Sequence, residues 1–425
     1  MDEVWPKYAP PAMWMTVVVA AISASTADLC SASGFRIPGL TVTGLSLSEA
    51  LVANRDEVGA LPYNPAAMSF HDEPSVSVGT IVVNPTSSAT PDGGSGRVDA
   101  NPDSPFVVPH LYAMIPVSER VAFGVNVVVP FGLETNWRNA TFPAFSGPLA
   151  AFEPTKTALE MLNINPNVSY RLSENFSVAI GMDYYYVPDA TSNSQGALLS
   201  GDGDSLTWNV ALLYSLGSWT LGLSYLAPVN VQIDGSFDAR SSLGFKVNTE
   251  TELAFPGTLQ VGARYQVSGN LGLEFDVDRT SWSKFQDIVV VSKDWIPGTG
   301  IEAGSELART TNNWDDTYSF HAGGTYQLTN TVQLRGGYTF EQDPQPESYY
   351  SPRYPNAQRH IFNTGIKYAT KRWQIEGALL YAKWKDRDVY NDAPYVGGDA
   401  NGTTAFNGRY ENSGLMAGIS VSMFF

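Results

Sequence analysis

The densest group of ionisable side chains in the sequence is a row of three carboxylates. Glu274, Asp276 and Asp278 alternate with apolar residues, so an extended strand places all three on one face. Such a row could bind a cation or pair with Arg264 or Arg335 on other strands. It could also be the polar wall of a barrel, which we favour because the opposite face of the same strand is apolar.

Other motifs that resemble reactive or metal-binding sites are incomplete. The acidic run 201–205 (GDGDS) lacks the bidentate Glu of a calcium-binding loop, so we interpret it as an acidic external loop. Ser281 and Lys284 match a Ser-x-x-Lys pattern, but the Lys-Thr-Gly partner of that pattern is missing. The histidines are scattered without metal-ligand spacing: His71, His110, His321 and His360. We therefore expect no catalytic residues, no metal and no cofactor, and a protein that is not an enzyme.

Composition narrows the possible functions further. Only 16% of the 425 residues are charged, where about a quarter is typical of soluble proteins. The formal net charge of -17 argues against a nucleic-acid partner, which requires clustered Lys and Arg. An acidic surface suits contact with lipopolysaccharide bridged by divalent cations.

The N-terminus predicts export. An apolar run, Met15–Ile22, is followed by small residues, which indicates a signal peptide over residues 1–33 with cleavage near Ala32. Asp2 and Glu3 are unusual in front of such a run, so translation could start at Met13 or Met15 instead. The only cysteine, Cys30, would be removed with the signal. Elsewhere no run of about eighteen apolar residues could form a membrane-spanning helix.

From Ser75 onward, hydrophobic residues recur at every second position. The clearest examples are 176–186, 271–277, 332–340 and 419–425. In each, apolar or aromatic residues alternate with small, polar or charged ones, which is typical of strands with one face in lipid and one in a polar interior. A soluble β-sandwich is the alternative, but it would need turns every 8–12 residues or so.

Turn signals give the number of strands. Short turns are expected at 116–120 and after Tyr170, Tyr214, Tyr265, Tyr326 and Tyr368. Long stretches rich in Gly, Pro, Asp and Asn lie between them, at 84–104, 136–156, 188–204, 234–250, 292–313, 341–357 and 387–408. Tight turns at one end and long loops at the other are typical of outer-membrane barrels. We therefore predict an all-β fold, a transmembrane antiparallel barrel of about fourteen strands over residues 75–425.

The two ends of the mature chain have separate predicted roles. Residues 34–74 show no alternation and are rich in Gly, Ser and Ala, which suits a hatch packed inside the barrel as a plug. The final strand alternates and ends on Phe425, which resembles the signal read by the barrel-assembly machinery.

Several segments, in matching order from residue 34 to 425, carry a resemblance to a known family. They are Gly34-Phe35, Ala60–Ser69 with its Asn64-Pro65-Ala66 element, Pro130–Trp137, Thr280–Gln286 and Trp314–Tyr318. These segments are similar to the mature N-terminus, the hatch, the third strand and two further signatures of the outer-membrane long-chain fatty-acid transporters, which include toluene-uptake relatives. The chain is identified as resembling that family.

The resemblance implies a mechanism. It implies a monomeric fourteen-stranded barrel that captures substrate at external loops and passes it to an interior site near Gly34 and Phe35. It also implies exit sideways at strand three, by passive diffusion without nucleotide. A general porin for polar solutes and a structural or adhesive barrel are the alternatives. A porin would lack a plug and would carry a constriction loop with charges of both signs.

The loop after strand three contains four large apolar residues, Phe142, Phe145, Leu149 and Phe152. An external loop that exposes such residues is expected to have a binding role. We expect a hydrophobic capture patch here. The alternative, which is compatible with it, is that the loop folds over the barrel mouth and buries its own aromatic rings.

Strand three contains a proline near its predicted external end. Pro130 has no N–H to give to the ladder, so the ladder is either interrupted there or the strand ends there. The resemblance favours an interruption, with Gly132 giving flexibility and Phe131 forming an apolar lip. We therefore predict a lateral opening at Pro130, Phe131 and Gly132.

Two departures from the family pattern concern the substrate. Asp315 stands where the fatty-acid members carry Lys, and 188–204 contains no Arg or Lys. Recognition of a carboxylate is therefore weakened, and a neutral hydrocarbon or aromatic substrate is favoured.

Overall fold

The computed structural model describes residues 34–100 and 105–425. Within these ranges all strand segments belong to one antiparallel sheet, which closes into a barrel because β1 pairs with β21 over their full length. Fourteen strands cross the barrel in the described residues, as the turn pattern predicts. The predicted signal peptide, residues 1–33, lies outside the described residues.

Seven of these strands are continuous and seven are divided into two segments. The continuous strands are β1 (Ser75–Pro91), β6 (Pro154–Ser173), β7 (Phe176–Ser194), β8 (Leu198–Leu216), β17 (Val332–Glu341), β18 (Arg359–Ala369) and β21 (Gly408–Phe424). The divided strands are β2 (Val98–Ala100) with β3 (Phe106–Pro116), β4 (Val121–Val128) with β5 (Leu133–Asn136), β9 (Trp219–Leu226) with β10 (Val229–Asp238), β11 (Lys246–Phe255) with β12 (Thr258–Gln266), β13 (Leu271–Thr280) with β14 (Asp287–Ser292), β15 (Glu306–Thr311) with β16 (Thr317–Gln327), and β19 (Trp373–Trp384) with β20 (Arg387–Val389).

Helices are short and lie inside the barrel or in connections. They are α2 (Val42–Ser46) and the 3-10 helices η1 (Val58–Ala60), η2 (Pro65–Phe70), η3 (Gly147–Phe152), η4 (Trp282–Lys284), η5 (Glu347–Tyr349) and η6 (Thr404–Phe406). In residues 34–100 and 105–425, no helix has the length and apolar character needed to cross a membrane.

The alternation in the sequence becomes an apolar outside and a polar inside. On β13, Leu273 and Phe275 are 48% and 51% exposed, whereas Glu274 and Asp276 are 4% and 0% exposed. The apolar side chains of the strand contact lipid, and the polar side chains form their hydrogen bonds and ion pairs inside the barrel.

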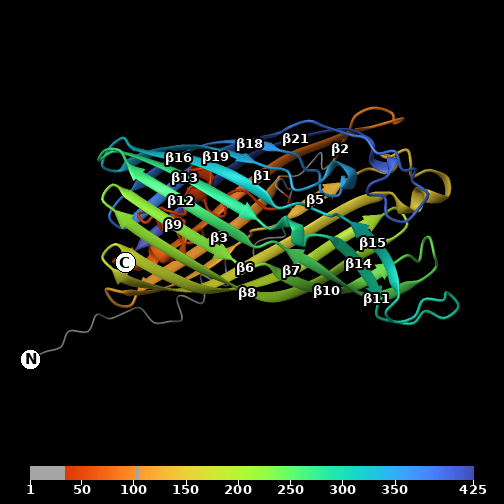
Figure 1. The fold of residues 1–425 in the computed structure, drawn as a ribbon, viewed down its shortest axis with the longest axis horizontal. Coiled ribbons are helices and arrows are strands. Elements are labelled where there is room, and N and C mark those ends of the chain that lie inside the picture. The colour runs from red at the N-terminus through yellow and green to blue at the C-terminus, as the bar shows by residue number, and fades with distance from the viewer. Residues whose placement is uncertain (1–33, 101–104) are drawn as a thin grey trace, which may run out of the picture.

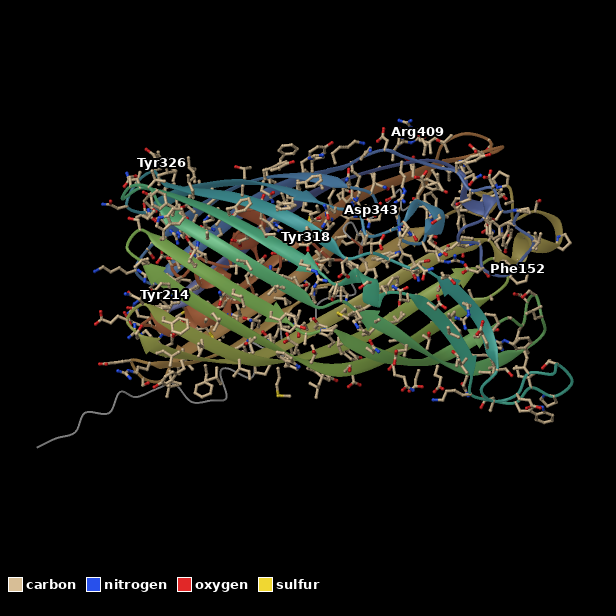
Figure 2. The ribbon with its side chains drawn as sticks, in the orientation of Figure 1. Phe152, Tyr214, Tyr318, Tyr326, Asp343 and Arg409 are labelled. Atoms are coloured by element: carbon tan, nitrogen blue, oxygen red, sulfur yellow. The ribbon has the colours of Figure 1, made fainter. Side chains whose placement is uncertain are left out.

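The six short turns lie where the sequence predicts them, at one end of the barrel (Figure 1). The tyrosines at five of them are outward-facing, between 38% and 49% exposed. Figure 2 shows Tyr214 and Tyr326 at this end and Phe152 at the opposite end, among the longer connections.

Three of the seven predicted long loops are much shorter than expected. Residues 188–204 belong largely to β7 and β8, which pair as far as Thr191 and Ser200. The connection in 234–250 is only 239–245, between β10 and β11, and the connection in 84–104 is 92–97, between β1 and β2. The expected acidic loop 201–205 is likewise part of β8. The strands continue to pair through these stretches although Gly, Asp and Asn are uncommon in strands, so composition alone predicted loops there.

The N-terminal segment, residues 34–74, lies within the barrel. Its helix α2 contacts β1, β17, β18, β19 and β21, and η2 contacts β3, β4, β6, β7 and β8. Contact with strands on opposite walls places the segment in the lumen, where Figure 1 shows it in red and orange behind the front strands.

Candidate functional site

The carboxylate row on β13 contacts the N-terminal segment at three successive points. Arg36 Nη1 donates to Asp278 Oδ2 at 3.0 Å, the Val52 N–H to Asp276 Oδ2 at 2.8 Å, and Asn54 Nδ2 to Glu274 Oε1 at 2.8 Å. All three carboxylates are buried. Of the interpretations open from the sequence, the row is a polar wall whose partners come from the N-terminal segment, with Arg264 3.9 Å from Glu274.

A second set of ion pairs holds the segment against β17 and β18, which follow β13 and β16 around the barrel. Arg335 on β17 pairs with Glu376 on β19 and, at 2.8 Å, with Glu57 of the N-terminal segment. Lys367 also pairs with Glu57, at 2.6 Å. Breaking a buried pair of this kind costs about 3–5 kcal/mol, so the body of the segment is firmly anchored.

The Asn64-Pro65-Ala66 element joins η2 to the barrel wall. The Asn64 side chain caps η2 by accepting from the Ala66 N–H, while its Nδ2 donates to the carbonyls of Val52 and Leu212. Pro65 fits the first helical turn because that turn requires no N–H from it. The Ala66 carbonyl accepts from two strand serines, Ser169 and Ser177.

Strand three is interrupted around Pro130. Segment β4 ends at Val128 and β5 begins at Leu133. The ladder between β3 and β4 stops at Leu111 opposite Val127, and beyond it, in the described residues, β5 pairs only with β6. Residues 129–132, which we name the kink, therefore leave the sheet.

Residues Phe35–Ile37, which we name the arm, pair with the kink. The Ile37 N–H donates to the Pro130 carbonyl at 3.0 Å and the Gly132 N–H to the Phe35 carbonyl at 2.9 Å. Arg36 lies opposite Phe131 as an isolated antiparallel bridge. An unpaired backbone group at membrane depth costs several kcal/mol, so the arm stabilises the interruption by supplying its missing partners.

The Phe35 ring fills a cage of six aromatic rings. Their centroids lie between 4.9 Å, for Trp282, and 6.3 Å, for Tyr354, from that of Phe35. The cage residues are Phe131, Phe255, Trp282, Phe285, Trp314 and Tyr354. Phe35 is only 2% exposed. Gly34 precedes it at φ +63°, and a Cβ there would lie 2.3 Å from the Trp282 ring, so glycine is required.

Interruptions of the strands create this cage. Phe131 comes from the kink, Trp282 and Phe285 from the break between β13 and β14, and Trp314 from the break between β15 and β16. Where a strand leaves the ladder, consecutive side chains no longer alternate between lipid and lumen, and large rings can turn inward. The Phe131 ring is buried in the cage, and its role as an apolar lip of a lateral opening stays a prediction.

Between the cage and the long-loop end lies a cavity of about 570 Å³, which we name the outer cavity. Its lining is largely apolar and includes Phe145, Phe152, Leu199, Phe237 and Tyr354. Since Tyr354 also belongs to the cage, the two sites adjoin. A volume of this size accommodates a small organic ligand.

The four apolar residues of the loop after strand three have different environments. Phe142 is fully buried against Trp137 and Phe406, and Leu149 is half-buried. Phe145 is buried and lines the outer cavity, while Phe152 is 46% exposed and lines it too. The expectation that all four are exposed is therefore wrong, because the loop closes on its own rings. A capture role stays a prediction, carried by Phe145 and Phe152.

Comparison with known proteins gives the family. The family model described as outer membrane protein transport protein (OMPP1/FadL/TodX) matches residues 23–425. The chain belongs to this family. The family consists of transport channels of the outer membrane, and the barrel is accordingly a bacterial outer-membrane protein.

Individual members of the family are distant in sequence but similar in length and fold. The long-chain fatty acid transport protein of Escherichia coli O6:H1 is 23% identical over 392 residues, which cover 79% of this chain and 83% of the relative. A crystal structure of a Pseudomonas aeruginosa FadL homologue has a TM-score of 0.76 at 18% identity, covering 92% of this chain and 99% of that one. The Ralstonia pickettii toluene transporter TbuX has a TM-score of 0.67 at 17% identity, covering 89% and 97%.

Sequence reasoning missed three residues of the site. Phe255 and Tyr354 complete the cage, and Arg353 lines the outer cavity. Phe255 precedes the Pro256-Gly257 pair that divides β11 from β12, and that break could have marked it. Nothing around Arg353 or Tyr354 distinguishes them from ordinary loop residues. The expectation of a neutral substrate considered only Asp315 and 188–204, and so did not include Arg353.

Proposed function

We propose that the protein carries hydrophobic small molecules passively across the outer membrane and releases them sideways at strand three. The substrates belong to the long-chain fatty acids or the hydrocarbons, including monoaromatics. The observation that carries this proposal is the double role of the arm. Its side chain fills the aromatic cage while its backbone closes the kink, so one displacement would open both.

The proposed route starts at the loops. A solute partitions onto Phe145 and Phe152 and enters the outer cavity, driven by apolar burial worth about 25 cal/mol per Å². It then competes with Phe35 for the cage. Once the ring leaves, the hydrogen bonds at Pro130 and Gly132 are released and the kink becomes a lateral opening. Gly34 and Phe35 are thus both part of the binding site and the gate.

The interior beneath the kink supports a sideways exit. Asn126, Asn163, Asn165 and Asn209 surround Asp183 there and hydrogen-bond to one another or to its carboxylate. Burying an apolar solute among amides would break those bonds without replacing them. The bilayer beside the kink is the more favourable destination, and no energy source is needed.

The remaining parts of the proposal concern the whole chain. Residues 34–74 act as the hatch, with Asn64, Pro65 and Ala66 fixing it to the wall, and residues 1–33 are the signal peptide. The barrel acts as a monomer in contact with outer-membrane lipid and lipopolysaccharide, without catalysis. The barrel-assembly machinery recognises the last strand, which ends at Phe425.

Uptake assays test the proposed function. In a host that lacks its own transporter, expression of the protein should increase uptake of radiolabelled oleate, of toluene or of both. Proteoliposomes that contain the protein should not swell in arabinose, because the lumen is filled. Uptake of neither hydrophobic solute, or rapid swelling in arabinose, would contradict the proposal and favour a general porin.

A further inference from the structure

A carboxylate without a cationic partner lies inside the barrel beneath the kink. Asp183 on β7 is 2% exposed, and it forms no ion pair in the part of the chain that the structure describes. Its two oxygens each accept one amide N–H, from Asn163 at 2.8 Å and from Asn209 at 2.7 Å. Other lumen carboxylates, such as Asp278 and Glu341, pair directly with an arginine. Neutral amides do not cancel the charge of Asp183, and a buried charge without compensation is costly.

Three amide oxygens close to this carboxylate accept no hydrogen bond from the described residues. They are the Oδ1 atoms of Asn163, Asn167 and Asn209, whose side chains are all at least nine-tenths buried. In Asn163 and Asn209 this oxygen shares a carbon with the nitrogen that donates to Asp183, so it lies beside the carboxylate. Exchanging the oxygen and nitrogen of either amide would turn an acceptor toward the carboxylate, so the amide orientation is fixed.

The strand register brings these groups to one place. Gly181 on β7 lies opposite Asn167 of β6 and Asn209 of β8, and Asp183 is the next residue on the same inward face. A Cβ on Gly181 would overlap Asn167 Oδ1 and would lie 2.7 Å from Asn209 Nδ2, so glycine is required for both amides to reach this point. Three neighbouring strands therefore supply one carboxylate and three amide oxygens.

A bound cation satisfies these groups better than a water molecule or a proton does. Carboxylate and amide oxygens are the ligands that hard cations prefer. Water could donate to the amide oxygens, but it would leave the charge of Asp183 uncompensated. A proton on Asp183 would remove the charge, but it gives a single donor to three oxygens. A cation neutralises the carboxylate and is a partner for all the oxygens together.

We propose that Asp183 and the three unpaired amide oxygens bind a monovalent alkali cation such as sodium. The four side chains carry one negative charge, so a monovalent ion makes the site neutral, whereas a divalent ion would leave a buried net positive charge. The ion fixes amides on β6, β7 and β8 in one arrangement. This inference goes beyond the proposed function, because it does not depend on which solute the protein transports.

The proposed ion site adjoins the aromatic cage. Tyr185 follows Asp183 by two residues on the inward face of β7, and its ring centroid lies 6.4 Å from that of Phe131 and 6.2 Å from that of Phe255. The ion therefore occupies the side of the cage that faces the short turns. An apolar solute in the cage would have to displace a bound ion to continue in that direction.

Anomalous scattering locates the ion directly. Crystals in which thallium(I) replaces sodium should show an anomalous peak in contact with the Asp183 carboxylate and the amide oxygens. Crystals of Asp183→Asn should lack the peak, because this substitution keeps the shape of the side chain and removes its charge. Asp202→Asn, at an exposed position on β8, is the matched control and should retain the peak.

Thermal unfolding gives a second, independent readout. With choline keeping the ionic strength constant, the unfolding midpoint of the unmodified protein should rise by about 2–4 °C and then saturate as sodium increases from about 1 to about 100 mM. Asp202→Asn should behave in the same way. The midpoint of Asp183→Asn should not depend on sodium, since that variant has no buried charge to neutralise.

The two measurements can each reject the site. Barrel folding of every variant is checked by heat-modifiable mobility on gels. Absence of an anomalous peak at Asp183 in the unmodified protein, or a sodium-dependent rise of equal size in Asp183→Asn, would overturn the proposal. A rise that calcium produces at about 1 mM and that Asp183→Asn abolishes would contradict the assignment to a monovalent ion.

Discussion

At the scale of single residues, Phe35 is the part of the chain that we propose a substrate replaces. Its ring makes edge-to-face or tilted contacts with all six cage rings, and such pairs contribute about 0.5–1.5 kcal/mol each beyond burial. The protein therefore carries an aromatic occupant of its own site. We expect the part of a solute that enters the cage to be apolar and about as large as a phenyl ring.

Removing the Phe35 ring should strengthen the binding of a solute in the cage. In Phe35→Ala the cage is partly empty and a ligand no longer competes with the ring, so we expect the purified protein to bind toluene about tenfold more tightly or better. Equilibrium binding to purified protein measures this. Phe123→Ala is the matched control, because Phe123 faces lipid on β4, and it should leave affinity unchanged. Weaker toluene binding in Phe35→Ala would mean that the ring is part of the ligand's wall rather than its competitor.

The Arg36–Asp278 pair should hold the arm in place. Asp278→Asn leaves a buried guanidinium without its 3.0 Å partner and weakens attachment of the arm by about 3–5 kcal/mol. We expect frequent brief openings in planar-bilayer recordings, with the barrel still folded. Asp202→Asn, at an exposed position on β8, serves as the control. Recordings as quiet as those of the unmodified protein would show that this ion pair does not restrain the arm.

At the scale of elements, the sequence allowed prediction of the strands and turns but not of the site they form. Period-two alternation and six turn signals were enough to predict fourteen strands. Lipid requires apolar side chains and the lumen requires polar ones, so successive residues of a strand must alternate. Of the strand breaks that build the cage, only the one at Pro130 was predicted, although Pro256-Gly257 also carried a signal. The segments around Trp282 and Trp314 were noticed through resemblance, and their inward rings depend on contacts between distant strands, which no local pattern encodes. Composition likewise did not show that the strands continue into the stretches at 84–104, 188–204 and 234–250.

Pro130 affects the hydrogen-bonded ladder between strand three and its neighbours. Pro130→Val restores an N–H and permits an extended strand through the kink, so uptake should slow while the barrel still folds. Pro166→Val, in the outward face of β6, is the control and should not affect transport. Unchanged uptake in a correctly folded Pro130→Val protein would be incompatible with exit through the kink.

At the scale of the whole molecule, a closed barrel contains a segment that is anchored at its body and less securely held at its end. Glu57 fixes the body to β17 and β18, and Asn54 fixes it to β13. The arm, in contrast, is held by two backbone hydrogen bonds, the Arg36 pairs and the Phe35 ring. From this difference we expect the arm to move while the body of the segment stays in the lumen.

Deleting the segment should open the lumen. A protein that lacks residues 34–70 should conduct ions in planar bilayers as a stable wide pore, because the strands themselves leave a polar interior. The unmodified protein should show no such conductance. A wide open channel in the intact protein would rule out a plug.

The most direct test of the account is to lock the arm to the kink. Arg36 and Phe131 lie opposite each other in an antiparallel bridge, a geometry that a disulfide can span. In a Cys30→Ser background, the pair Arg36→Cys and Phe131→Cys is oxidised, and uptake of oleate and toluene is compared before and after reduction of the same sample. We predict that oxidation lowers uptake of both at least about tenfold and that reduction restores it. Equal uptake by the cross-linked and reduced forms would contradict the claim that the arm is the gate.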